Sequence, residues 1–186
     1  MKYICLNLKL FIMENQPVPS KNVILNYGLY LGIASILVSV ILYALGMHYD
    51  QDWKQGTFGF IIMVAIIFLG LKKYKELNNG YLTIGQALKT GVGIALIGGI
   101  ISLIYSYVFM NFIEPDFMTN IMAGAEEKMI EQNPNLTDEQ IEQALAISSK
   151  MSSPVILASI SIFFSLFFGF IVSLITGLIL KNNPEN

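Results

Sequence analysis

Residues 154–180 read PVILASISIFFSLFFGFIVSLITGLIL, a stretch that contains no charged side chain. Apolar residues lie on every side of a helix built from it, so no face is left for water, as a helix of a soluble bundle would require. Such a helix is about 40 Å long at 1.5 Å per residue, which exceeds the roughly 30 Å hydrocarbon core of a bilayer. We therefore expect a transmembrane helix that tilts or protrudes.

Three further segments share this apolar character, and they run from about Val23 to Met47, from about Trp53 to Leu71 and from about Ala87 to Phe112. Hydrophobic residues make up 54% of the 186 residues and charged residues only 13%, about half the charged share of a soluble domain. The sequence predicts an all-α integral membrane protein with four transmembrane helices rather than a soluble bundle. Its expected parts are an N-terminal cytoplasmic tail (1–22), a membrane domain (23–181) and a cytoplasmic C-terminal tail (182–186).

The lysines indicate an orientation, because cytoplasmic loops carry an excess of basic residues. The two ends of the chain and the connection between the second and third segments lie on one side of the membrane, and they hold Lys21, Lys72, Lys73, Lys75, Lys89 and Lys181. The connections on the opposite side hold Lys54, Lys128 and Lys150. We expect both termini and the 72–89 loop to face the cytoplasm, and the 48–52 and 113–153 loops to face outward.

The long outer loop, residues 114–153, has a helical pattern of its own. Phe117, Ile121, Ala125 and Met129 recur every four residues, as on one face of an amphipathic helix. After a break at Asn133-Pro134-Asn135, Thr137 and Gln140 have the spacing of a capping box. We expect an extracytoplasmic amphipathic helical hairpin that either binds a protein partner or only caps the bundle. Its acidic residues are Glu114, Asp116, Glu126, Glu127, Glu131, Asp138, Glu139 and Glu142.

Small residues recur at intervals of four along three of the apolar segments. Because lipid is as apolar as leucine, small residues that let two backbones approach are what drives helices together in a membrane. We interpret these stripes as packing surfaces that face the bundle interior, with the phenylalanines of the last segment facing lipid; the alternative is a serine-lined polar pathway. The stripes are Gly28 and Gly32; Gly91, Ala95 and Gly99; Gly98, Ser102 and Ser106; and Ser161, Ser165, Gly169, Ser173 and Gly177.

Side chains that carry chemistry are few. The sequence has no Walker loop, GxGxxG, HExxH or GxSxG motif, and it has a single histidine and a single cysteine. A weak candidate for a divalent cation site lies at the outer interface, where carboxylates and one imidazole follow the first and third segments; the alternative is ordinary solvated carboxylates. Its members are His48, Asp50, Asp52, Glu114 and Asp116. We expect no cofactor and no catalytic residue.

Transport is a further class to weigh, and ion-coupled carriers place an ionisable residue within the bilayer. The predicted spans have none at mid-depth, so a small channel or transporter subunit would have to act as a homo-oligomer. A net charge of −2 and the absence of arginine give no sign of a nucleic-acid partner. The leading expectation is a non-enzymatic membrane protein; the oligomeric pore and, third, a membrane-embedded enzyme are the alternatives.

Three stretches carry a family resemblance, namely Asn26-Tyr27-Gly28-Leu29, the run from Leu82 to Gly91, and Ile113-Glu114-Pro115-Asp116-Phe117. With them the chain resembles, from about Met13 to Lys181, the four-span membrane proteins of Bacteroidota catalogued as domain of unknown function 4199. The resemblance implies a bacterial inner (cytoplasmic) membrane location and carries over no catalytic residues. It also favours Met13 as the start of translation, which leaves residues 1–12 untranslated.

Overall fold

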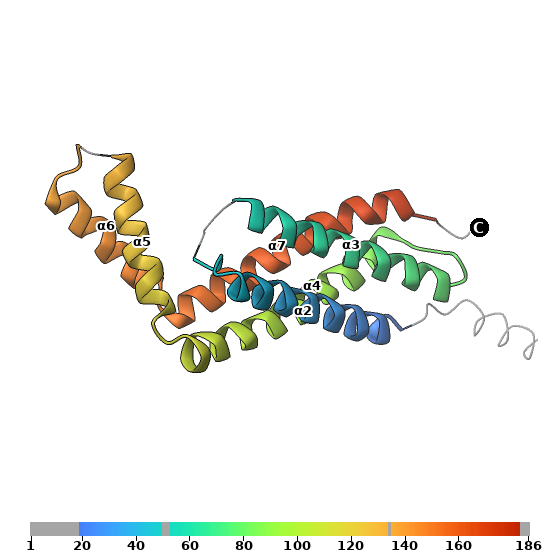
Figure 1. Cartoon of the computed structure of the whole chain (residues 1–186). Helices are drawn as coiled ribbons and strands as arrows, with labels where there is room; N and C mark the ends of the chain where they lie inside the picture. The colour runs from blue at the N-terminus through green and yellow to red at the C-terminus, as the bar shows by residue number, and fades with distance from the viewer. Residues whose placement is uncertain (1–18, 50–52, 134, 183–186) are drawn as a thin grey trace, which may run out of the picture.

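The computed structural model describes residues 19–49, 53–133 and 135–182, and these residues are almost entirely helical (Figure 1). The expectation about residues 1–12 therefore lies outside the described residues. The elements are α2 (Lys21–Ala44), α3 (Trp53–Leu77), α4 (Ile84–Val108), the π-helical turn η1 (Phe109–Ile113), α5 (Phe117–Gln132), α6 (Asp138–Met151) and α7 (Pro154–Leu180).

Four of these helices are long and apolar enough to cross a membrane: α2, α3, α4 continued by η1, and α7. In the most apolar window of each, only 11 to 22% of the residues are buried inside the protein. Most of the apolar surface therefore has to be covered by something other than this chain, as it is by lipid around a multi-pass membrane protein. The predicted all-α class with four candidate spans is confirmed.

Helix α4 lies at the centre and contacts each of the other three spans. It runs parallel to α2 and antiparallel to α3 and α7, so the start of α2 and the end of α7 lie at one end of the bundle and the α5–α6 hairpin at the other (Figure 1). At the first end the chain is tied together, because Leu82 and Asn182 exchange two backbone hydrogen bonds of 2.8 and 3.1 Å.

Helices α4 and α7 approach each other through a series of small residues. A Cβ added to Gly177 would lie 2.7 Å from the Cβ of Ala87, closer than real Cβ atoms approach. Each step of four residues up α4 meets a step of four down α7, as two antiparallel helices in close contact require. We call this contact the small-residue zipper, and its pairs are Ala87 with Gly177, Gly91 with Ser173, Ala95 with Gly169, and Gly99 with Ser165.

Helix α2 packs on α4 in a different way, because isoleucine side chains fill the space that glycines leave. A Cβ added to Gly32 would lie 2.6 Å from the Cβ of Ile101, and Gly28 faces Ile97 in the same manner. On the reverse side Leu31 reaches into the gap at Gly98. The close parallel packing of α2 and α4 therefore depends on the missing side chains of these glycines.

The ends of the predicted elements differ from the structure in several places. Helix α2 ends at Ala44 instead of near Met47, and α4 begins at Ile84 instead of near Ala87. Helix α3 continues to Leu77 instead of ending near Leu71, and α4 is followed by the π-helical turn η1, which the apolar periodicity does not indicate. Elsewhere the local signals agree with the structure: α7 spans residues 154–180 with Pro154 in its first turn, and Thr137 and Gln140 form the expected capping box.

We predict that Gly169→Val destabilises the protein by about 1–3 kcal/mol, because its side chain would overlap Ala95 in the small-residue zipper. Thermal unfolding in detergent, followed by circular dichroism, measures the effect. Gly56→Val is the control, since nothing lies within 4 Å of a Cβ at that position of α3. Equal melting temperatures for the two variants would contradict the packing described here.

Candidate functional site

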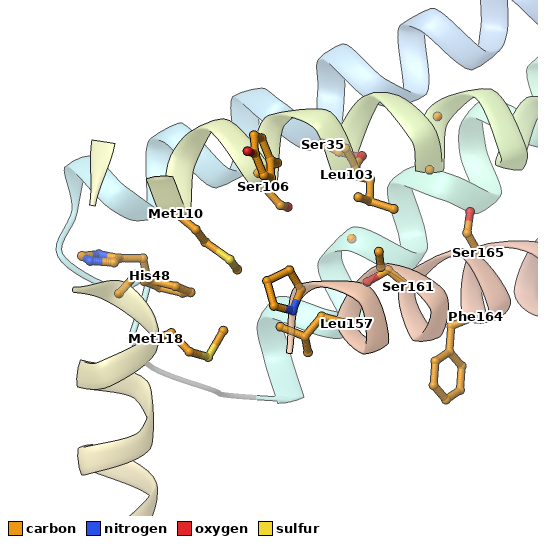
Figure 2. A pocket seen from close by; sticks show the side chains of 18 of the residues that line it. Ser35, His48, Leu103, Ser106, Met110, Met118, Leu157, Ser161, Phe164 and Ser165 are labelled. Carbon is orange, nitrogen blue, oxygen red and sulfur yellow. The ribbon is translucent and has the colours of Figure 1, made fainter. Parts of the chain in front are cut away.

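A cleft of about 1050 Å³ opens where the small-residue zipper ends. Its floor is formed by Gly99 and Ser165, the last pair of the zipper. The next position in the series on α4 is Leu103, which is too large to allow the same close approach to Ser161 of α7. Beyond this point the two ribbons separate, and the side chains of Leu103 and Ser161 lie around the space between them (Figure 2).

The walls of the cleft combine hydroxyl groups with apolar and sulfur-containing side chains. The polar lining residues include Ser35, Gln55, Ser102, Ser106, Tyr107, Asn111, Ser161 and Ser165. The apolar lining residues include Met63, Leu103, Met110, Phe117, Met118, Leu157, Phe164 and Phe168. Of the described residues that line the cleft, only His48 belongs to the group of Asp, Glu, His, Lys and Arg. Such a lining suits a molecule with both a polar and an apolar part.

Not all of the serine hydroxyls have a partner. Ser35 donates to the carbonyl of Leu31 at 2.9 Å, and Ser165 donates across the zipper to the carbonyl of Ala95 at 2.8 Å. The hydroxyls of Ser102, Ser106 and Ser161 make no hydrogen bond to any other residue in the described part of the chain. These three hydroxyls are therefore free to donate to, and accept from, a molecule in the cleft.

A cluster of hydrogen-bonding side chains stands at the mouth of the cleft, and we call it the mouth cluster (His48, Tyr49, Glu114 and Asn120). His48 Nε2 lies 3.1 Å from Glu114 Oε2, and the Tyr49 hydroxyl donates to the same carboxylate. The Asn120 amide donates to the Tyr49 oxygen at 2.8 Å. The side chains of His48 and Glu114 are only 14% and 16% exposed. The cluster thus ties the connection after α2 to the end of η1 and to α5.

Aromatic rings enclose this cluster. Phe117, in the first turn of α5, stacks on His48 and Tyr49 with ring centroids 6.2 and 5.8 Å apart. Tyr43 and Phe109 meet the imidazole edge to face. Since Phe117 also lines the cleft, one of the rings that shield the His48–Glu114 pair is part of the cleft wall.

The π-helical turn η1 is what brings Glu114 to this place. The amide of Glu114 donates to the carbonyl of Phe109 at 2.8 Å, five residues back instead of four. The extra residue in this turn changes the direction in which the following side chains point. Such turns are rare and occur frequently at functional sites.

The cation site considered from the sequence is only partly assembled. His48 and Glu114 lie together, whereas Asp116 is exposed on the surface. Within residues 19–49, 53–133 and 135–182 there is no group of three or more His, Cys, Asp or Glu side chains that would hold a metal ion. Asp50 and Asp52 lie outside the described residues.

The small residues singled out from the sequence divide between two environments. Gly28, Gly32, Gly91, Ala95, Gly169, Ser173 and Gly177 are buried between helices, Gly99 and Ser165 form the floor of the cleft, and Ser161 is exposed within it. The five phenylalanines between Phe163 and Phe170 are all exposed. Two of them, Phe164 and Phe168, also line the cleft.

Sequence reasoning missed three residues of this region. Leu103, which ends the small-residue zipper, carries a signal that is visible in the sequence, because it interrupts a period of four small residues. Tyr49 and Asn120 carry none, since their contacts join parts of the chain 65 and 71 residues apart.

A family model described as Protein of unknown function (DUF4199) matches residues 26–182. The chain belongs to this family. The match confirms the resemblance seen in the sequence, and it covers all of the small-residue zipper, the cleft and the mouth cluster. The site is therefore part of the DUF4199 domain itself and not of an appended segment. No curated protein and no solved structure matches the chain.

We predict that Glu114→Ala loosens the start of α5, because it leaves His48 and Tyr49 without their shared acceptor. The free energy of local opening at residues 117–121 should fall by about 1–3 kcal/mol, the usual cost of unpaired buried polar groups. Hydrogen exchange in detergent measures it. Glu114→Gln, which keeps an acceptor for Tyr49, should have a smaller effect, and exposed Asp116→Ala should have none. Equal protection in all three variants would contradict this role of Glu114.

Proposed function

We propose that this protein is a non-enzymatic, multi-pass protein of the bacterial inner membrane that binds an amphiphilic small molecule in the cleft. The observation that carries the proposal is the lining, in which hydroxyls from α2, α4 and α7 stand among methionine and phenylalanine side chains. The cleft volume of about 1050 Å³ lies at the upper end of the roughly 300–1,000 Å³ of pockets for small molecules and cofactors.

The lining is open to the surroundings, and it does not favour a catalytic role. Ser106 and Ser161 are exposed, so the cleft communicates with the surroundings of the bundle and is not a sealed void. The nitrogen Nε2 of His48 faces Glu114, and in the described part of the chain no serine hydroxyl hydrogen-bonds to the imidazole. A serine activated by a neighbouring base, which nucleophilic catalysis requires, is not supported by this geometry.

The distribution of lysines supports an orientation in the membrane. Lys21, Lys72, Lys73, Lys75 and Lys181 all belong to the end of the bundle that is tied by Leu82 and Asn182. Because basic residues accumulate on the cytoplasmic side, we place this end in the cytoplasm and the α5–α6 hairpin in the periplasm. The cleft then opens in the periplasmic half of the membrane.

The hairpin supports a second candidate function, the binding of a basic segment of another protein. No residue of α5 is buried, and Ile130 and Ile147 are 45% and 61% exposed. Among its described side chains, acidic residues outnumber the two lysines. Apolar side chains surrounded by carboxylates suit a partner that presents both apolar and basic side chains.

Filling the cleft tests the first candidate. We predict that Ser161→Phe weakens the binding of an environment-sensitive fluorescent amphiphile at least tenfold, because the ring occupies the space that the ligand needs. Ser159→Phe is the matched control, since Ser159 lies on the same helix and turns its hydroxyl to Val155 outside the cleft lining. The same affinity in both variants, with both melting as the wild type does, would refute ligand binding in the cleft.

Site-directed photocrosslinking in intact cells tests the second candidate. A photoreactive residue at Ile147 should give one discrete adduct of higher mass, whose yield falls severalfold when Glu139 and Glu142 are changed to lysine. The same residue at Ile179, 70% exposed on α7, is the control and should not give this adduct. If the charge changes leave the adduct at Ile147 unaffected, the proposed recognition of a basic partner is wrong.

A further inference from the structure

The charges around the cleft bear on the polar part of its ligand. Arginine is absent from the chain, and no lysine belongs to the described lining of the cleft. The imidazole of His48 is already matched by Glu114 at 3.1 Å. A phosphate or carboxylate head would therefore enter a region of low dielectric without a cation to pair with, which is a costly arrangement.

A cationic head meets the converse difficulty. The described lining contains no carboxylate, and the nearest one, that of Glu114, already accepts from Tyr49 and faces His48. An ammonium group in the cleft would have hydroxyl and amide oxygens and aromatic faces as partners, but no carboxylate. The cleft thus favours a head that carries no charge.

The three hydroxyls without a partner lie close together along the axis of the bundle. Ser106 lies about 10 Å of helix before the end of η1, and Ser102 lies about 16 Å before it. Ser161 lies about 10 Å of helix after the start of α7. In the register of the small-residue zipper, where Gly99 meets Ser165, Ser161 lies level with Leu103 and therefore between the levels of Ser102 and Ser106. Ser106 and Ser161 both lie around the cleft in Figure 2. Ser102 and Ser106 share one face of α4, since they are four residues apart.

A hydroxyl both donates and accepts, so three of them are best satisfied by a head that also does both. A hydrocarbon tail that merely filled the cleft would offer these hydroxyls no partner beyond the carbonyls of their own helices. Met63, Met110, Met118, Phe164 and Phe168 supply the apolar remainder of the wall, and methionine adapts to an irregular chain.

We infer that the ligand of the cleft is an uncharged lipid with a polyol head, of which a monoacylglycerol is the simplest example, with its head against Ser102, Ser106 and Ser161. This inference rests on the proposed function, because it names the class of amphiphile that the cleft holds. It places the head of the lipid inside the bundle, about 10–16 Å below the ends of the helices, and the acyl chain along the methionine and phenylalanine side chains.

Competition by lipids that share one acyl chain tests the inference on the full-length protein in detergent. The probes are monooleoylglycerol, oleic acid, oleoyl lysophosphatidic acid and oleoyl lysophosphatidylcholine, each displacing the fluorescent amphiphile. Monooleoylglycerol should bind at least tenfold more tightly than each of the other three. The triple variant Ser102→Ala, Ser106→Ala, Ser161→Ala should lose this preference while still binding all four lipids through their chains.

Two further variants keep the result independent of folding defects. Ser161→Thr retains a hydroxyl and should retain most of the preference, whereas Ser161→Ala should reduce it severalfold. If all four lipids bind the wild type equally, or if the triple variant keeps the preference, the polyol head is refuted and ligand binding in the cleft stands. If Ser161→Phe weakens none of the four, the cleft is not the binding site and both proposals fall.

Discussion

Close approach of the α4 and α7 backbones is the contact on which the rest of this protein depends. Lipid gives helices no hydrophobic reason to associate, so the stability of the bundle has to come from contacts that only small residues allow. The small-residue zipper supplies them over four successive pairs. Because the same series stops at Leu103, the residue that ends the zipper also opens the cleft. One periodic pattern thus determines both where the two helices pack and where the cleft begins.

Much of the fold could be predicted because the relevant signals are local. An uninterrupted apolar stretch, Pro154 after Ser153, and the capping box of Thr137 and Gln140 each act within a few residues, and the structure agrees with them at α6 and α7. The recurrence of small residues also identified most of the positions that α4 and α7 bury. The pattern does not indicate which stripe of small residues packs against which other stripe. It also does not indicate that Ser102, Ser106 and Ser161 border a cleft instead of a packed interface.

The mouth cluster shows why the remainder could not be predicted. Glu114 meets Tyr49 and His48 across more than sixty intervening residues, and it does so only after an extra residue in η1 has turned the chain. The start of α5 is part of the hairpin and also part of the cleft wall, because Phe117, Met118 and Ile121 line the cleft. A partner that moved α5 would alter the cleft, and an occupant of the cleft would by the same thermodynamic linkage alter the affinity for that partner.

The π-helical turn has a consequence for how this segment tolerates changes in length. Each residue of a helix advances the chain by about 100° around the axis, since 3.6 residues complete a turn. In an ordinary α-helix, deleting one residue turns everything after it by that angle. Here, deleting one residue between Phe109 and Glu114 would leave Glu114 four residues after Phe109 instead of five, so its amide could still donate to the same carbonyl and its side chain would stay on the side of Tyr49. A single in-frame codon loss there would therefore disturb the hairpin less than removal of the carboxylate, because the extra residue of the π-helical turn takes up the change in length.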